Sequence, residues 1–387
     1  MSRIHLRRTL AAALAVSATA ALAPAAEAGK RDKQANKRGN SPVVSVMTRN
    51  LYLGTDLIPI ATAPDIDAFK QAATAGFEQV QATNFPARAR LIAREIKRTR
   101  PDLIGLQEAA LWRTGPEDGV HPNATDVAYN FVAILRRALK RIGLDYGVAR
   151  VTEEADIEGP TSEGFDVRLT MRDAILVNRK RRGLRIVGRG GDNFEELLVL
   201  PTVVGNITVK RGYAYADVVL ASRKGGKGKR RRARGAAKRV QRHRFRFVDT
   251  HLEAFLDSFR EAQARELVGP NGPVAGKRTV ILVGDVNSDP KGSQPEAWQI
   301  IEDSTLRDTW PWLYPRRPGY TCCTVGPALM DPPRPSPFDH RIDDVFAQGK
   351  LRPLNARVVG TNPATSRTRS GLWASDHAGV VTRIRLR

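Results

Sequence analysis

Apolar runs that end in polar residues recur along this 387-residue chain and predict buried strands. The run PVVSVMTRN ends at Asn50, DLIGLQE ends at Glu108, and ILVGDVN carries Asp285 and Asn287 at its end. Similar patterns predict further strands in DAILVN, GLRIVG, ITVKRGYAYADVVLA, FRFVDTHL, RIDDVFA and HAGVVTRIRL. The chain is therefore expected to be rich in β-sheet.

Helical spacing of apolar residues is found in three segments, 65–99, 125–142 and 258–267. Pro101 is expected to end the first helix and Gly143 the second. Strands and helices interleave without the regular alternation of a parallel barrel. The sequence has no glycine-rich phosphate-binding motif, so no nucleotide cofactor is expected. The pattern favours an α/β (α+β) fold with mixed sheets and helices outside them.

The first 28 residues have the composition of a secretory signal peptide. Three arginines precede an apolar run over residues 10–23, and the small-residue pattern AEA ends at Ala28. A retained membrane anchor is disfavoured because the run is alanine-rich and shorter than the ~20 residues of a spanning helix. We expect a secreted protein with a basic flexible segment at 29–40 and one folded domain over 41–387.

Positive charge is concentrated in one block of the chain. The formal net charge is +23, or +21 once the three Arg and one Glu of residues 1–28 are removed, and residues 223–246 hold 13 Lys or Arg and no acid. This block contains too little apolar surface to fold, so we expect a disordered insertion at about 222–244 that connects two strands of a hairpin. It is either a solvated loop or an arm for a polyanion such as nucleic acid or acidic lipid.

The two cysteines of the chain are adjacent, at Cys322 and Cys323. Neighbouring Cα atoms lie ~3.8 Å apart, below the usual disulfide range, so a bridge between them would be strained. Two reduced core thiols, or one intermolecular partner, are the alternatives. No Cys or His cluster at zinc spacing accompanies the pair, so it is not expected to bind a metal.

Polar side chains at the strand ends indicate the chemistry of the protein. Oxygen ligands from Asn50, Glu108, Asp285 and Asn287 suit Mg²⁺ or Ca²⁺ better than zinc. Any one of them alone is more often a turn residue than a catalytic residue. Several such positions at the ends of rigid strands together favour a functional site.

Two histidines, His251 and His377, have carboxylates nearby in the sequence and suit proton transfer or hydrogen bonding to a phosphoryl oxygen. A metal ion with an acid/base pair is what hydrolysis of a phosphate ester requires. An enzyme with a serine nucleophile is disfavoured because the GxSxG motif is missing, and a glycosidase would leave the histidines unexplained.

The order of the motifs TRN, IGLQE, THLEA, GDVNS, RIDDVF and SDH resembles the endonuclease/exonuclease/phosphatase superfamily over roughly residues 43–387. This superfamily includes deoxyribonuclease I, abasic-site endonucleases, inositol-phosphate phosphatases and neutral sphingomyelinases, and the chain looks like an exported bacterial subgroup. The resemblance implies a four-layered sandwich of two mixed sheets flanked by helices. It also implies phosphoester hydrolysis that depends on Mg²⁺, or on Ca²⁺ or Mn²⁺.

The resemblance also implies roles for individual residues. Metal contacts fall on Asn50, Glu108, Asp285 and Asp376. Catalytic roles fall on His251, Asp285, Asn287, Asp343, Asp376 and His377.

Within the catalytic set, Asp285 would orient or deprotonate the attacking water and Asn287 would hold the phosphate. His377 would contact the scissile phosphate, polarised by Asp376. His251 would be a general acid with Asp343 as its orienting partner.

A further pair, Arg172 and Asp173, lies where relatives contact the substrate phosphate, although an exposed ion pair is the favoured explanation.

The expected substrate is nucleic acid, DNA or RNA, because of the charge of the mature chain and its basic arm. A phospholipid is the second choice, because THLEAFLDSF resembles a sphingomyelinase stretch and aromatic residues crowd the segment 308–323. These aromatic residues are Trp310, Trp312, Tyr314 and Tyr320. A small-molecule phosphatase is third, and a catalytically silent polyanion-binding protein is the alternative outside enzymes. We expect a monomer.

Overall fold

The computed structural model describes residues 41–223, 240–323, 325–330 and 338–387. The expected signal peptide, the segment 29–40 and most of the basic insertion lie outside these residues, so they remain predictions. None of the helices within the described ranges has the length and hydrophobicity needed to cross a lipid bilayer.

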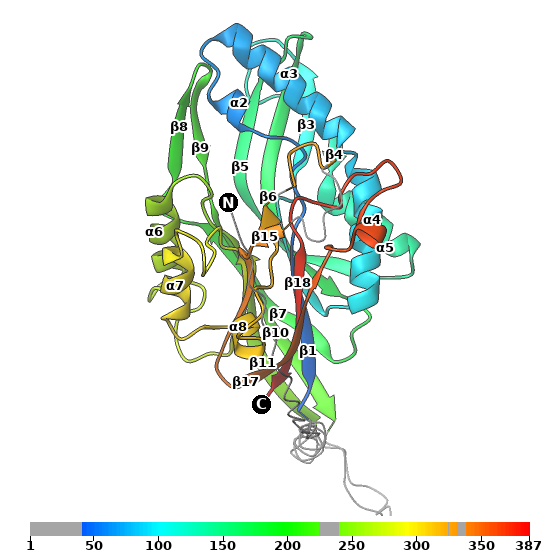
Figure 1. Ribbon diagram of the computed structural model, residues 1–387, viewed down its shortest axis with the longest axis vertical. Helices are drawn as coiled ribbons and strands as arrows, with labels where there is room; N and C mark the ends of the chain where they lie inside the picture. Colours follow the sequence, from blue (N-terminus) through cyan, green and yellow to red (C-terminus); the bar gives the residue numbers. More distant parts are fainter. Residues whose placement is uncertain (1–40, 224–239, 324, 331–337) are drawn as a thin grey trace, which may run out of the picture. The chain divides into compact units, whose positions relative to one another are not determined.

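Two mixed sheets form the centre of the domain (Figure 1). In the first, β5 pairs with β6 outside the main path of strands. The strands of the first sheet, in spatial order, are β17 (Leu351–Val359), β18 (Gly379–Leu386), β1 (Val43–Asn50), β2 (Leu103–Gln107), β6 (Phe165–Asn178), β3 (Leu111–Pro116) and β4 (Asp126–Asn130), with β5 (Tyr146–Pro160) beside β6.

The second sheet pairs β11 in parallel with β12, and β12 antiparallel with β16. Its strands, in spatial order, are β13 (Arg307–Asp308), β16 (Asp343–Gln348), β12 (Val280–Asp285), β11 (Val240–His251), β10 (Gly212–Arg223) and β7 (Leu184–Asn193). Two small hairpins, β8 (Leu198–Thr202) with β9 (Gly205–Val209) and β14 (Cys322–Cys323) with β15 (Phe338–His340), complete the strands of the described residues.

Helices cover the outer face of each sheet (Figure 1). The longer ones on the first sheet are α3 (Ile66–Ala82), α4 (Phe85–Thr99) and α5 (Phe131–Arg141), and those on the second are α6 (Asp257–Val268) and α7 (Glu296–Glu302). Short helices α2 (Ile58–Ala61), α8 (Thr309–Leu313) and α9 (Pro363–Ser366) lie in connections.

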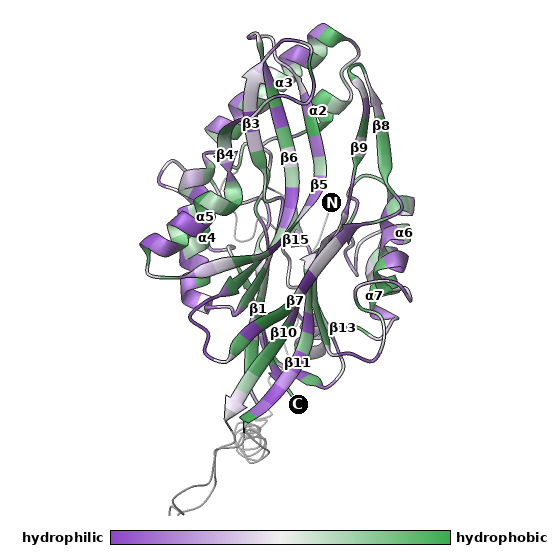
Figure 2. Cartoon of the chain, turned by 180° about the vertical axis from the view of Figure 1, so that it is seen from behind, coloured by the Kyte–Doolittle hydropathy of each residue, from purple (hydrophilic) through white to green (hydrophobic). Residues whose placement is uncertain are grey.

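Three buried apolar clusters separate four layers. The strand β12 contributes to two of these clusters. Its Ile281 and Val283 face the other sheet, while Val280 and Leu282 face α6 and α7. A strand buried on both faces has a continuous apolar sequence with side chains alternating between the two sides. Figure 2 shows the outer helices carrying hydrophilic and hydrophobic residues side by side. The expected four-layered sandwich is confirmed.

Two of the expected helices are corrected by the structure. The segment 65–99 forms two helices, because Asn84 adopts a left-handed conformation and caps α4, and Pro86 cannot continue the helix before it. The segment 125–142 begins as strand β4, which pairs with β3, and Asn130 then caps α5 by accepting the N–H of Ala133 at 3.2 Å. The third expected helix, 258–267, is confirmed as α6.

The two strands on either side of the basic insertion form a hairpin, and both extend further into the basic block than expected. β10 and β11 pair in register from Gly212 with His251 to Arg223 with Val240. The ends of the expected disordered region, residues 222–223 and 240–244, therefore belong to strands. Residues 224–239 lie outside the described part of the chain.

Candidate active site

The functional side chains lie at one edge of the sandwich, where strands of both sheets end. On the first sheet, Asn50 ends β1 and Glu108 directly follows β2, and these two strands run parallel. On the second sheet, His251 pairs with Asp285 across β11 and β12, and Asp285 pairs with Asp343 across β12 and β16. The register therefore builds a row of three ionisable residues opposite the tips of β1 and β2.

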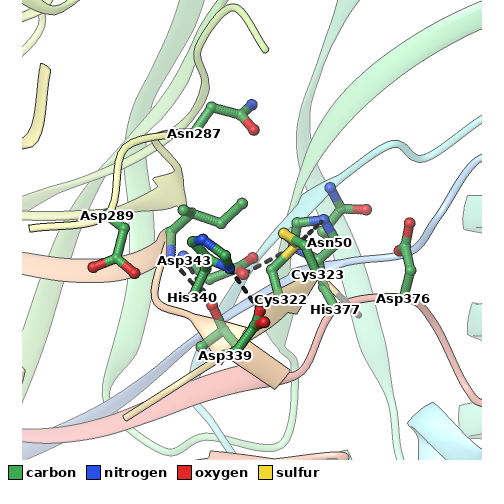
Figure 3. Close-up of a disulfide and its surroundings, with 12 residues drawn as sticks. Asn50, Asn287, Asp289, Cys322, Cys323, Asp339, His340, Asp343, Asp376 and His377 are labelled. Atoms are coloured by element: carbon green, nitrogen blue, oxygen red, sulfur yellow. Dashed lines mark hydrogen bonds and ion pairs between the residues drawn. A yellow bond between two sulfur atoms is a disulfide. The ribbon is translucent and has the colours of Figure 1, made fainter. Parts of the chain in front are cut away.

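Asp343 is the carboxylate that orients His377. Nδ1 of His377 lies 2.9 Å from Asp343 Oδ2 and 3.6 Å from Asp285 Oδ2 (Figure 3). The resemblance assigned Asp343 to His251 and Asp376 to His377. The structure corrects this pairing, because the segment that leads into β18 packs beside β16 and places His377 against Asp343.

Asn50 holds two carboxylates at a fixed separation. Its Nδ2 donates to Glu108 Oε1 at 3.2 Å and to Asp285 Oδ2 at 3.0 Å, while its Oδ1 accepts the N–H of Tyr52 at 2.9 Å. The N–H of Leu53 donates to Glu108 Oε2 at 2.7 Å. Asn50 therefore sets the spacing of the two carboxylates. Its Oδ1 keeps a second lone pair, so its expected role as a metal ligand remains a prediction.

Asn287 lies beyond the end of its strand. β12 ends at Asp285, and Asn287 turns away with a φ of 49°. Its backbone N–H donates to Asp285 Oδ1 at 3.0 Å, and its side-chain Nδ2 donates to Leu252 O at 2.9 Å. The expectation that both residues project from one strand is therefore wrong. A second N–H of the same amide remains to face a phosphate.

Glu108 also has a left-handed backbone, with a φ of 54°. Non-glycine residues rarely adopt this conformation, and they cluster at functional sites where the surrounding structure enforces them. The N–H of Ala109 donates to Arg172 O at 2.7 Å, which fixes the turn that presents the Glu108 carboxylate.

His251 is held by Arg211, a residue that sequence reasoning missed. Nη1 of Arg211 lies 2.9 Å from His251 Nδ1, and Nε2 of His251 lies 3.7 Å from Asp285 Oδ2. The same Nη1 lies 3.3 Å from Nε2, and because a guanidinium only donates, the ring nitrogen that accepts from it carries no proton. The signal for Arg211 in the sequence is weak, because it is one basic residue of KRGYAY directly before β10.

Arg172 and Asp173 have separate positions, and neither forms an exposed ion pair. Both side chains are buried. Arg172 donates to the carbonyl oxygens of Ala109 and Ala110 at 3.0 and 3.2 Å, so it supports the backbone beside Glu108. Asp173 lies on the site side, with Oδ1 4.0 Å from His251 Nδ1.

Asp376 lies beside the row, next to Ser375. The Ser375 hydroxyl lies 3.0 Å from Asn50 O and 3.2 Å from Asp376 Oδ1, and it accepts the N–H of His377 at 3.2 Å. Figure 3 shows Asp376 on the far side of His377 from Asp343. This serine therefore connects the segment that carries Asp376 and His377 to the end of β1.

The two histidines have opposite electrostatic surroundings. Burial opposes a charge on the imidazole of His377, but three carboxylates outweigh it and hold its pKa well above the usual value. They belong to Asp343, Asp285 and Asp376. Burial lowers the pKa of His251 well below the usual value, and the charge of Arg211 adds to this. His377, rather than the expected general acid His251, is the charged donor in this arrangement.

Two carboxyl groups of the site have pKa values closer to neutrality than usual. Burial raises the pKa of Asp285 to about 7, although the positive charge of His377 opposes it. Burial also raises the pKa of Asp376 to about 6, and the charge of Glu108 adds to the effect while His377 opposes it. A carboxyl group with a pKa near neutrality can exchange a proton with water at physiological pH.

The surplus of carboxylates at this edge fits a divalent cation. Oδ1 of Asp343 is buried and has no hydrogen-bond partner within the described ranges. One carboxylate oxygen of Asp285 and one of Asp343 lie within 4.8 Å of each other, beside the charged His377. Of the expected ligands, Glu108 and Asp285 face each other across Asn50. Carboxylate oxygens are the ligands that Mg²⁺, Mn²⁺ and Ca²⁺ prefer.

The two cysteines form a vicinal disulfide beside His377 (Figure 3). Their Cα atoms lie 3.3 Å apart across a cis peptide bond, whereas the spacing assumed from the sequence was that of a trans peptide. Sγ of Cys322 lies 3.6 Å from His377 Nε2. Of the alternatives that the sequence left open, the structure therefore has the bridge between the two neighbours.

A four-layered sandwich with carboxylates and histidines at one edge defines a hydrolase of phosphate esters. A model of the Endonuclease/Exonuclease/phosphatase family matches residues 74–377 of the chain. The chain belongs to this family, whose members are phosphoester hydrolases that depend on divalent metals. The resemblance stated from the sequence is confirmed.

Solved structures show the same fold. A family protein from Bacteroides thetaiotaomicron is 14% identical, with a TM-score of 0.53, and the match covers 90% of this chain and 99% of that one. A mannosyl-6-phosphatase of the same organism is 15% identical, covering 88% and 99%, with a TM-score of 0.49. The human Nocturnin catalytic domain is 17% identical, covering 90% and 96%, with a TM-score of 0.47. No significant match was found among curated proteins.

The opposite states of the two histidines can be measured in metal-free protein. At about pH 6.5, the usual midpoint of a histidine, we expect His377 to be protonated and His251 to be neutral. Replacement Asp343→Asn should lower the pKa of His377, because it removes the closest carboxylate. Imidazole ¹⁵N NMR in EDTA measures the protonation states of both histidines. The variants His251→Gln and His377→Gln assign their signals. Two histidines that titrate together near their usual midpoint would contradict the geometry.

Proposed function

We propose that this protein is a secreted, divalent-metal-dependent phosphodiesterase that hydrolyses nucleic acid. The observation that carries the reaction class is the row of His251, Asp285 and Asp343 against Asn50 and Glu108, with His377 bonded to Asp343. A bound divalent ion would polarise a phosphoryl oxygen and offset the developing negative charge. Glu108, Asp285 and Asp376 are the residues that would hold it.

The side chains of the row divide the remaining work. His377, kept charged by its carboxylates, donates from Nε2 to a phosphoryl oxygen and stabilises negative charge there. Asp285, which lies between Asn50 and His377, orients an attacking water and takes its proton. His251 stays neutral, with Nε2 on the Asp285 side, and Asn287 offers its remaining amide N–H.

Charge supports nucleic acid as the substrate. The chain without residues 1–28 carries a net charge of +21, and residues 224–239 alone hold nine Lys or Arg and no acid. A polyanion that binds such a segment releases its condensed counterions, which gives affinity without sequence preference. We also propose that the protein is secreted and acts as a monomer. Secretion rests on the sequence of residues 1–28.

A phospholipid is the second candidate, because exposed apolar side chains lie near the catalytic edge. Phe255 and Leu256 are 55% and 44% exposed, and they follow His251 by only four and five residues. An amphipathic surface of this kind can enter the interface of a bilayer. In the aromatic segment, Trp310 and Tyr314 pack edge to face, whereas Trp312 and Tyr320 are 51% and 38% exposed and add to this surface.

Side-by-side hydrolysis of plasmid DNA, RNA and sphingomyelin vesicles by the purified protein tests the proposal. With Mg²⁺ we expect cleavage of DNA or RNA that EDTA abolishes. Replacement Glu108→Ala should lower the rate by at least about 100-fold, because charge stabilisation of several kcal/mol depends on the ion. The matched control Glu78→Ala, at an exposed position of α3, should leave the rate unchanged. Phosphocholine release with intact nucleic acid would overturn the substrate, and an unchanged Glu108→Ala rate would overturn the metal role.

Removal of residues 224–239 tests the basic arm. A two-residue Asn-Gly turn takes the place of these residues, because Arg223 and Val240 pair at the end of the hairpin and need a turn to join them. The logarithm of the DNA-binding constant should depend less steeply on the logarithm of salt concentration, by about 0.9 for each phosphate that the arm neutralises in the wild type. A variant of equal length with the nine Lys and Arg replaced by Gln should behave like the deletion. An unchanged slope in both variants would make the arm a passive loop.

A further inference from the structure

A second group of metal-ligand side chains lies away from the catalytic edge. His121 belongs to the loop between β3 and β4, Glu158 to β5 and Asp166 to β6. Each residue offers one ligand atom, and the three atoms lie within 4.8 Å of one another. Asp166 is seven residues from Asp173 along β6, which at ~3.3 Å per residue places this group about 23 Å from the catalytic row.

The distances in this group converge on one nitrogen. Nδ1 of His121 lies 3.3 Å from Glu158 Oε1 and 3.4 Å from Asp166 Oδ2. The backbone N–H groups of Asn123 and Ala124 donate to Glu158 at 2.9 to 3.1 Å, so the loop that carries His121 is fixed against β5. The two carboxylates and the imidazole therefore face a common point.

Asp166 is the feature that ordinary ion pairing does not explain. Its side chain is fully buried, and within the described ranges neither carboxylate oxygen has a hydrogen-bond partner. Burial without hydrogen bonds is costly for a carboxylate, and bound cations are one of the few ways to offset the cost. Glu158 is also buried, whereas His121 is 40% exposed, so the group is open to solvent on the histidine side only.

Nearby charges leave this group short of positive charge. Arg168 lies 3.6 Å from Glu158, but it is shared with Asp156, whose Oδ1 accepts from its Nε at 2.9 Å. Burial raises the pKa of Asp166, and the negative charge of Glu158 adds to this although His121 opposes it.

We propose that His121, Glu158 and Asp166 form a second metal site, which binds a divalent transition-metal ion such as Zn²⁺. One imidazole and two carboxylates with an open fourth position make a donor set that zinc accepts, whereas Mg²⁺ and Ca²⁺ prefer oxygen ligands alone. The ion ties the loop between β3 and β4 to the β5–β6 hairpin. The site does not depend on the proposed hydrolysis, because it shares no residue with the catalytic row.

Zinc titration of the full protein tests this site by calorimetry and by competition with a chromogenic chelator. Wild-type protein should bind one more equivalent of Zn²⁺ than His121→Ala or Asp166→Asn. His340→Ala is the matched control, because His340 is exposed and pairs with a single carboxylate, that of Asp339. It should keep the full stoichiometry. Since His121 is partly exposed, His121→Ala is expected to fold even if Asp166→Asn does not.

Hydrogen exchange of residues 117–125 gives an independent measurement. Zn²⁺ should slow exchange in the wild type and leave His121→Ala unchanged, while hydrolysis of nucleic acid with Mg²⁺ stays the same in both. The site would be overturned by equal Zn²⁺ stoichiometry in the wild type and His121→Ala, or by exchange rates in the wild type that do not change with Zn²⁺. His121 would then form only an ion pair with its carboxylates.

Discussion

The concentration of carboxylates at the edge where the two sheets meet is the constraint on which the site depends. Glu108, Asp285, Asp343 and Asp376 share that edge with one charged imidazole, that of His377. Charges removed from water are costly unless they are paired, so this arrangement persists only if the surroundings hold the groups in place and a cation balances them. Burial raises the pKa values of Asp285 and Asp376, and the neighbouring carboxylates of Asp343 and Glu108 add to the effect.

Buried arginines provide the rigidity that the carboxylates need. Arg88 donates to the carbonyl oxygens of Leu51 and Tyr52, after β1, and of Ala374, just before the segment with His377. Arg49 is buried against Glu95 at 3.2 Å and also donates to the carbonyl oxygen of His377. A guanidinium group has several fixed donors and can bind several carbonyls at once. The segment after β1 and the segment that carries His377 therefore cannot move independently. The metal ligands and the histidine are held by the same scaffold.

Much of the fold could be predicted from the sequence, because strands buried on both faces have continuous apolar runs and their polar ends mark one edge. The helix break at Asn84 was missed although Asn-Phe-Pro signals it, and β4 was taken for helix because its pairing with β3 is not a local property. Site membership followed from the motifs, but the partner of His377 did not. That pairing is set by the packing of the segment before β18 beside β16, which brings together residues 34 positions apart in the sequence. Arg211 and the second metal-ligand group likewise become visible only in three dimensions.

The measurement that tests the central claim most directly is anomalous diffraction from crystals of the protein soaked in Mn²⁺. The account predicts an anomalous peak within coordination distance, about 2.0 to 2.3 Å, of carboxylate oxygens in the row that includes Glu108 and Asp285. The peak should disappear in Glu108→Ala crystals of the same form. A well-ordered edge with no peak at saturating Mn²⁺, and with the carboxylates bonded only to protein and water, would contradict the claim that these buried charges are arranged for a cation.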